Sequence, residues 1–377
     1  MTDAIEIEMG EEAPEAGATP LEEKYKKQMR QIFPQKIELP LSTLPEMIEK
    51  QIDLSPDFQR RDIWKTAKQS RFVESIIMNV PIPPVFLGED DYGKYVVLDG
   101  RQRLTAISSF LANTYALESL KVWDELNGLT WNDLRKKGLD RAILRRFIPA
   151  VLILKESSPE VKYDVFDRLN TGGMEAEPME IRNAIYRGPF CALLHKLSSN
   201  STFRKLWDIP EDADERQTNR TYARMDDLEL VLRFFALQKY QAMLGRFKEY
   251  LNTEMDARNK AYKVRPELAK ADTALFERAI ENTWKVFGVD AFRKPAEPGG
   301  KKGVKSAPLA DAVLFAFADV EASKLTPTVI KKLSTDLQEL FTNDIEFKKS
   351  IGTGTNGKGA TQTRLEKTRE VVQRALA

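Results

Sequence analysis

The chain contains very little histidine or cysteine. Its 377 residues include one of each, His195 and Cys191. One histidine excludes a zinc site built on a histidine pair and a His-Asn-His nuclease centre, and one cysteine excludes an internal disulfide. His195 lies in an apolar stretch with helical spacing, so we expect it to be structural. We expect no zinc, no haem and no disulfide.

Long apolar runs and an excess of one charge sign are also scarce. The longest apolar run, residues 147–154, is much shorter than the ~18 residues of a membrane span. The chain starts without the basic and apolar regions of a secretory signal. Its 58 basic and 57 acidic residues exclude a uniformly basic coat but allow a local basic groove. We therefore expect a cytoplasmic protein without a membrane partner.

The length suits two domains, because domains commonly run to ~100–200 residues. Residues 1–34 begin as an acidic segment rich in Ala, Gly and Pro, which is typical of a disordered lead-in. Residues 35–187 mix strand and helix patterns, whereas residues 188–377 are helical apart from a Gly-, Pro- and Lys-rich loop. The predicted fold class is α+β, with a mixed domain followed by an all-helical domain.

Apolar periodicity predicts the elements of the first domain. A Thr-x-x-Gln pattern at Thr66 and Gln69 predicts a capping box before one of the helices. The predicted strands are 37–39, a hairpin of 85–87 with 95–98, and a buried strand at 148–154. The predicted helices are 40–51, one after Gln69, 102–113, and one that starts at 158 and stops at 170.

The residues that follow the predicted hairpin, Asp99 to Thr105, could handle phosphate. They form a strand-to-helix turn, and the start of a helix attracts anions. Gly100 permits close approach of a ligand, and Arg101 and Arg103 match phosphate oxygens. Asp99 could hold a metal or orient water, and Gln102 could position that water. The same residues would also suit a plain turn with a capping aspartate and solvated arginines.

Three other clusters have both a functional and a structural interpretation. Phe58 with Gln59, Arg60 and Arg61 could grip a nucleotide or DNA, or pack as an ordinary loop. A turn after the helix at 158, with Arg168 and Asn170, could wrap an anion or simply end that helix. A basic loop that contains Lys301, Lys302 and Lys305 could contact the nucleic-acid backbone, or it could simply be solvated.

The order of these motifs resembles the N-terminal domain family of GmrSD-type modification-dependent restriction enzymes. The resemblance covers about residues 36–190. It implies a fold similar to that of ParB and sulfiredoxin N-terminal domains. It also implies an activity, NTP hydrolysis with Mg²⁺, in the setting of DNA restriction or phage defence. The matching pieces are Phe58-Gln59-Arg60 with Trp64, Ile82-Pro83-Pro84, Val97 to Thr105, Phe166 to Gly173, and Arg182-Asn183.

Carried over by that resemblance, the catalytic candidates are Asp99, Gln102 and Arg103. The phosphate-binding candidates are Gly100, Arg101, Thr105, Gln59, Arg60, Arg168 and Asn170. Candidate DNA contacts are Phe58, Arg61, Lys301, Lys302 and Lys305.

Two positions depart from the family pattern. Arg101 replaces the usual first glutamine of the Asp-Gly-Gln-Gln-Arg motif, and Phe58 replaces a frequent tyrosine. The nuclease domain with a His-Asn-His centre that many relatives carry is not expected, because the chain has one histidine. The resemblance thus implies DNA and a separate nuclease subunit as partners.

The expected activity is that of an NTP-hydrolysing regulatory or sensing protein. Two alternatives stay open: a DNA-binding module without turnover, similar in logic to ParB-type proteins, and a metal-dependent nuclease acting through Asp99. Few carboxylates cluster near Asp99 in the sequence, which disfavours the nuclease.

Overall fold

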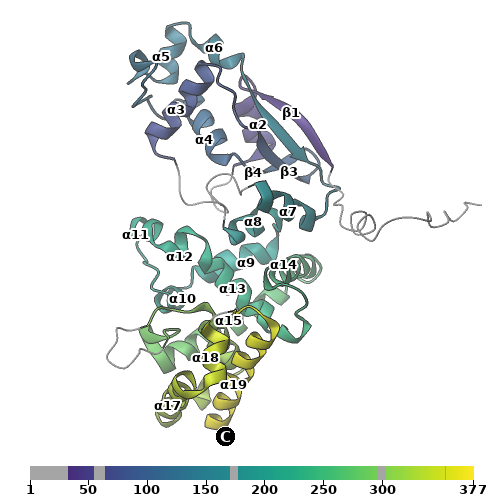
Figure 1. Cartoon of the computed structure of the whole chain (residues 1–377), viewed down its shortest axis with the longest axis vertical. Helices are drawn as coiled ribbons and strands as arrows, with labels where there is room; N and C mark the ends of the chain where they lie inside the picture. Colours follow the sequence, from purple (N-terminus) through teal and green to yellow (C-terminus); the bar gives the residue numbers. More distant parts are fainter. Residues whose placement is uncertain (1–32, 55–63, 170–176, 295–302, 353) are drawn as a thin grey trace, which may run out of the picture.

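The structure, a computed structural model, describes residues 33–54, 64–169, 177–294, 303–352 and 354–377. The lead-in expected at residues 1–34 lies outside this range apart from its last two residues. The described chain is α+β: a mixed sheet with its helices forms the N-terminal part, and helices alone form the rest (Figure 1). The predicted fold class is therefore confirmed.

The sheet has five strands in the order β1-β5-β3-β4-β2. Strand β5 is inside the sheet, antiparallel to β1 and parallel to β3, and β3 and β4 form the predicted antiparallel hairpin. The short β2 lies parallel to β4 at the other edge. The strands are β1 (Pro34–Pro40), β2 (Ile52–Asp53), β3 (Val85–Asp91), β4 (Lys94–Asp99) and β5 (Phe147–Ile153).

Helices cover this sheet and connect its strands. The predicted capping box is wrong: Lys65 is the N-cap of α3 and makes no side-chain cap, and the Gln69 amide instead donates to the carbonyl of Trp64 at 2.8 Å. The helices are α2 (Leu44–Lys50), α3 (Thr66–Ile77), α4 (Arg101–Leu111), the 3-10 turn η2 (Asp124–Leu126), α5 (Trp131–Lys136), α6 (Asp140–Leu144), α7 (Pro159–Leu169) and α8 (Pro178–Ile185).

The remaining chain is a packed set of helices, as predicted. They are α9 (Pro189–Ser198), α10 (Ser201–Leu206), α11 (Ala213–Thr218), α12 (Arg220–Ala223), α13 (Asp226–Leu237), η4 (Tyr240–Ala242), α14 (Phe247–Val264), α15 (Leu268–Phe287), η5 (Gly288–Asp290), α16 (Ala307–Phe317), η6 (Ala322–Lys324), α17 (Pro327–Asn343), α18 (Ile345–Gly352) and α19 (Lys358–Leu376). Among the helices of the described residues, none combines the length and apolar character needed to cross a membrane.

Two hydrophobic cores meet at the sheet. Adjacent residues of β4 point to opposite faces, and Val97 belongs to the core beneath α2, α3 and α4. Leu98 belongs to the larger core of the helical part, together with Ile153 at the end of β5. Helices α7 and α8, which the sequence analysis assigns to the first domain, also contribute to this larger core. The carboxyl end of β4 therefore faces the helical part.

Candidate functional site

The turn between β4 and α4 is built on a glycine that the backbone requires. Gly100 has φ of 90°, which lies in the left-handed region that favours glycine. A Cβ at this position would also collide with Cγ1 of Val85 at the start of β3. The absent side chain thus lets α4 begin directly against β3, and the nitrogen of Leu104 donates to the Gly100 carbonyl at 3.0 Å.

The side chains of Asp99 and Arg103 lie together across this turn. The Arg103 guanidinium donates to Oδ2 of Asp99 at 2.8 Å. Its other terminal nitrogen donates to the carbonyls of Pro83 and Pro84, just before β3. The Arg103 side chain is 14% exposed and that of Asp99 is 40% exposed. Arg103 is thus held on several sides, while the carboxylate remains open to a ligand.

Gln102 contacts the chain that leads into α3. Its amide oxygen accepts a hydrogen bond from the backbone nitrogen of Trp64 at 3.0 Å. The Trp64 ring packs edge-on against Phe72, and the Lys68 ammonium lies 4.5 Å above it. The first turn of α4 is therefore tied to Trp64, just before α3. The four candidates Phe58, Gln59, Arg60 and Arg61 lie outside the described residues.

Arg101 faces α8 rather than the Asp99–Arg103 pair. Burial lowers the pKa of Arg101 to about 10, although the nearby Asp53 carboxylate acts in the opposite direction. Arg187 and Glu180 are further charged neighbours of this guanidinium. Arg187 forms an ion pair with Asp53 at the end of β2. Arg101 therefore lies in a charged junction between the sheet and α8, and Thr105 is half-buried one turn further along α4.

Sequence reasoning missed the charged residues of this junction. Asp53 and Arg187 are 134 positions apart, and neither lies in a recognisable motif. Only the parallel pairing of β2 with β4 and the packing of α8 on β4 bring them together. No local pattern could have identified them.

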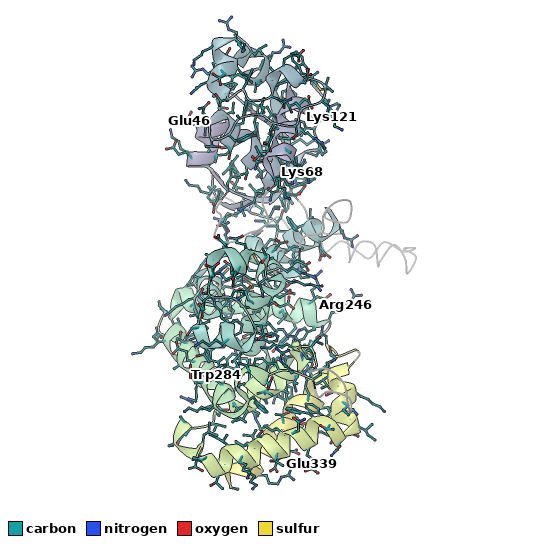
Figure 2. All side chains as sticks on the ribbon, turned by 90° about the vertical axis from the view of Figure 1, so that its left-hand side faces the viewer. Glu46, Lys68, Lys121, Arg246, Trp284 and Glu339 are labelled. Carbon is teal, nitrogen blue, oxygen red and sulfur yellow. The ribbon has the colours of Figure 1, made fainter. Side chains whose placement is uncertain are left out.

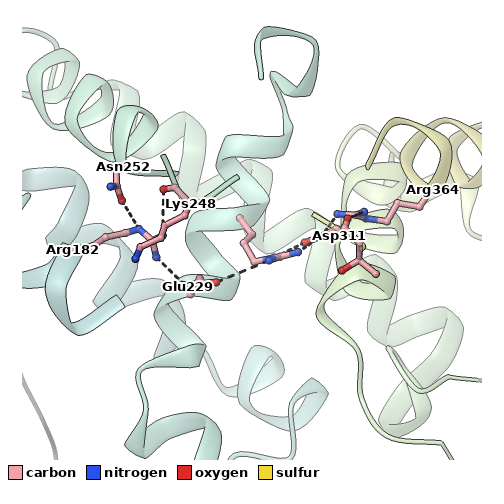
Figure 3. A network of polar contacts seen from close by, with 8 residues as sticks. Arg182, Glu229, Lys248, Asn252, Asp311 and Arg364 are labelled. Atoms are coloured by element: carbon pink, nitrogen blue, oxygen red, sulfur yellow. Dashed lines mark hydrogen bonds and ion pairs between the residues drawn. The ribbon is translucent and has the colours of Figure 1, made fainter. Parts of the chain in front are cut away.

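The motif residue Arg182 has a buried, structural setting. Its side chain is 1% exposed and donates to Asn252 of α14 and Glu229 of α13, each at 2.8 Å. A weaker bond reaches the Lys248 carbonyl at 3.4 Å, as Figure 3 shows. Arg182 therefore joins α8 to two helices of the helical part. Arg168, at the end of α7, is exposed, and Asn170 lies outside the described residues.

His195 and Cys191 share one partner, the neighbouring motif residue Asn183. Oδ1 of Asn183 accepts from the Cys191 thiol at 2.9 Å and lies 3.1 Å from Nε2 of His195. Burial raises the pKa of the Cys191 thiol to about 12, which disfavours a reactive thiolate. These contacts join α8 to α9 and give the histidine a structural environment.

The described part of the basic loop is tied to the protein surface. The Lys305 ammonium donates to Asp208 at 2.9 Å and also to the carbonyl of Leu206. Arg293 donates to the same Asp208 at 2.7 Å. Lys305 is thus used within the protein, which weakens its case as a DNA contact. Lys301 and Lys302 lie outside the described residues.

Together, the β4–α4 turn offers a helix start, an open carboxylate and a fixed guanidinium. Helix starts and arginine forks bind phosphate, and Mg²⁺ in phosphate sites commonly uses only one or two carboxylates, with phosphate oxygens and water as its other ligands. Asp99 can supply one such carboxylate. The part of the chain that the structure describes contains no group of three or more His, Cys, Asp or Glu side chains suited to a metal. The donors thus fit an NTP with Mg²⁺ better than a cage made of protein ligands alone.

Comparison with known proteins agrees with the resemblance drawn from the motifs. Residues 42–187 match the family model described as GmrSD restriction endonuclease, N-terminal domain. The matched segment begins before α2 and ends after α8, so it contains the β4–α4 turn and every strand except β1. No curated protein and no solved structure matches the chain.

Proposed function

We propose that this protein hydrolyses NTP as a regulatory or sensing component of DNA restriction or phage defence, because residues 42–187 match the family model of the GmrSD restriction endonuclease N-terminal domain. The proposed setting follows from the family. The proposed activity rests on one observation: an open carboxylate and a fixed guanidinium lie side by side at the start of α4.

Each residue of the turn has a proposed role. Asp99 would hold the Mg²⁺ of the nucleotide, and that ion would neutralise charge on the phosphoryl oxygens. Arg103 orients the Asp99 carboxylate through its 2.8 Å bond and presents positive charge to the phosphates. The amide oxygen of Gln102 is engaged with Trp64, so we assign Gln102 a positioning role for the segment before α3.

A DNA-binding module without turnover is the second candidate. The observation in its favour is that Arg103 already has three acceptors, the Asp99 carboxylate and two carbonyls. An arginine satisfied in this way can serve to shape the turn without contacting a nucleotide. A nuclease acting through Asp99 has less support, since the described residues hold no cluster of metal ligands around it.

The deciding experiment is phosphate release from each of the four NTPs with Mg²⁺, with and without duplex DNA. We compare wild type with Asp99→Asn, which keeps an acceptor for Arg103 but removes the charge. We expect hydrolysis by the wild type and a loss of about 10²–10³ in rate for the variant, the cost of removing an electrostatic group from a phosphoryl-transfer site. Arg103→Lys should also be impaired, because lysine keeps the charge but loses the fork.

Glu339→Gln is the matched control, because it removes one carboxylate from the exposed surface of α17 at the C-terminal end of the molecule, far from the turn (Figure 2). It should hydrolyse as the wild type does. Melting temperatures identify any variant that simply fails to fold. A wild type that binds DNA but releases no phosphate from any NTP would establish the non-catalytic module instead. Full activity in folded Asp99→Asn would remove Asp99 from the mechanism.

A further inference from the structure

The α5–α6 hairpin has a local excess of positive charge that the whole chain lacks. Residues 131–146 contain six basic residues and two acidic ones, in a protein with a formal net charge of +1. The acidic residues are Asp133 and Asp140. The basic residues are Arg135, Lys136, Lys137, Arg141, Arg145 and Arg146.

Four of these cations form what we call the α5–α6 basic surface: Arg135, Lys137, Arg141 and Arg145. All four are exposed, and within the described residues none of their side chains has a hydrogen bond or an ion pair. Lys136 approaches Asp133 only at 3.7 Å, and Arg146 donates to Oδ1 of Asn79 at 2.6 Å. The four side chains thus carry charge that no carboxylate of the described protein neutralises.

Unpaired arginines also occur elsewhere in the described chain, among them Arg71, Arg265 and Arg278. The α5–α6 basic surface gathers three unpaired arginines within residues 135–145, whereas nine other arginines form ion pairs with carboxylates. The nine are Arg103, Arg182, Arg187, Arg204, Arg224, Arg233, Arg258, Arg293 and Arg364.

The helices that carry this surface are firmly anchored. Thr130 and Asp133 form a reciprocal capping box at the start of α5. Trp131, Leu134 and Ile143 are buried in the core beneath the sheet. Arg141 and Arg145 are four residues apart at the end of α6, which places them on the same side of the helix. The cations are therefore presented from a fixed base.

The surface lies away from the β4–α4 turn. Helices α5 and α6 are at the end of the molecule opposite the C-terminal helices (Figure 1), whereas Arg101 at the turn is close to Arg187 after α8. A ligand on this surface would therefore leave the turn accessible to a nucleotide.

We propose that the α5–α6 basic surface binds the phosphate backbone of duplex DNA. This inference rests on the proposed function in DNA restriction and adds the place of contact. Three of the four residues are arginine, whose planar fork matches phosphate oxygens. Among the described residues their charge has no ion-pair partner, so binding would break none of the ion pairs seen there. Contacts of this kind give affinity without sequence preference and release counterions.

The test measures binding of a fluorescein-labelled duplex by anisotropy between about 50 and 200 mM salt, where backbone contacts lose affinity steeply. The variants are Arg141→Ala/Arg145→Ala and Arg141→Glu/Arg145→Glu. Lys348→Ala/Lys349→Ala removes two exposed cations from α18 and is the matched control. We expect the alanine pair to bind about tenfold more weakly and to lower the salt slope by about 2, since each lost phosphate contact lowers it by about 1. The glutamate pair should bind more weakly still.

Three results would overturn the inference: unchanged affinity and salt slope in the α6 variants, an equal loss in the α18 control, or absence of duplex binding by the wild type.

Phosphate release measured on the same samples separates this inference from the proposed function. If the α6 variants still hydrolyse NTP but no longer bind duplex DNA, both the proposed hydrolysis and the proposed binding surface are supported. If the α6 variants hydrolyse NTP and bind duplex DNA as the wild type does, only the binding surface is refuted. Both arginines lie in or just after the last turn of α6, where a cation contributes about 0.3–1 kcal/mol, so only a small loss of melting temperature is expected.

Discussion

Two glycines of the β4 region separate the effect of backbone conformation from that of crowding. Gly100 and Gly93 have φ of 90° and 70°. A Cβ at Gly100 meets Val85, but a Cβ at Gly93 has no atom within 4 Å. We predict that Gly93→Ala costs about 1 kcal/mol in the free energy of unfolding, the left-handed penalty alone. Gly100→Ala should cost at least about 1–3 kcal/mol more, because overpacking is added.

Urea unfolding of both variants measures this difference. In a Val85→Ala background, Gly100→Ala should lower the free energy of unfolding by less than it does in the wild type, because part of the crowding is relieved. The cost of the left-handed backbone conformation should remain. Equal destabilisation by the two glycine substitutions would mean that Val85 moves aside, and the close approach of α4 to β3 would not depend on glycine.

Asp226, the first residue of α13, makes stability depend on pH. Burial raises its pKa to about 6, against the opposing effect of Arg224. An aspartate in an unfolded chain has a pKa of about 3.9, so the folded protein binds this proton more tightly. That contribution to stability is present below about pH 4 and is lost as the pH rises through about 6.

We therefore predict that Asp226→Asn raises the free energy of unfolding by about 1–2 kcal/mol at pH 7.5. The advantage should shrink as the pH falls toward 4, because the wild-type carboxyl then becomes protonated. Urea unfolding across this range tests the prediction. A gain that does not change with pH would show that the effect comes from packing rather than from the titration of Asp226.

At the scale of elements, the two faces of β4 belong to different cores. Val97 packs under α4, and its neighbour Leu98 packs with α7, α8 and the helical part. We predict that Val97→Ala and Leu98→Ala each cost about 2–4 kcal/mol, as buried truncations do. Hydrogen exchange should then differ: the first variant should lose protection in α4 and the second in α8 and α9. Loss of protection in the same helices for both variants would contradict two separate cores.

Regular elements could be predicted from sequence where the pattern repeats often enough. The hairpin of β3 and β4, the strand β5 and the helix α4 each show several apolar positions at the expected period. Helices α5 and α6 contain only six and five residues, which is too few for a period to be visible. The capping box failed because Lys65 rather than Thr66 is the N-cap, and the Gln69 amide donates to the Trp64 carbonyl instead of accepting from the N-cap nitrogen.

The site could be predicted only where its residues are neighbours in sequence. Asp99, Gly100 and Arg103 form one motif, and the structure keeps them together. Arg182 follows a motif too, but its partners Glu229 and Asn252 come 47 and 70 residues later. A pattern of neighbouring residues contains no information about such contacts, so the motif alone could not show that Arg182 is a buried structural arginine.

At the scale of the whole molecule, a chain of charged residues, all buried except the partly exposed Glu229, joins distant helices (Figure 3). It runs from Arg182 through Glu229 and Arg233 to Asp311, and then to Arg364 of α19. Asp311 accepts from Arg233 at 3.0 and 2.6 Å and from Arg364 at 2.8 Å. Burial acts to raise the pKa of Asp311, but the two arginines outweigh it and hold the pKa below its usual range.

We predict that Asp311→Asn costs about 3–5 kcal/mol in the free energy of unfolding, since it leaves two buried guanidinium groups without their carboxylate. Replacing all three with apolar residues, Arg233→Met/Asp311→Leu/Arg364→Met, should recover much of that loss, because no unpaired charge remains. Thermal unfolding of the two proteins provides the measurement. A melting temperature of Asp311→Asn equal to that of the wild type would mean that this carboxylate does not stabilise the contact between α13, α16 and α19.

The position of α8 limits how such proteins can recombine during evolution. The helix lies within the matched family segment, yet Met179 and Ile181 are buried in the core of the helical part. A gene fusion that attached another C-terminal partner after residue 187 would have to provide apolar surface for both residues and a carboxylate for Arg182. The matched segment should therefore be inherited together with α13 and α14. Joining it to a different C-terminal part should require compensating substitutions both before and after residue 187.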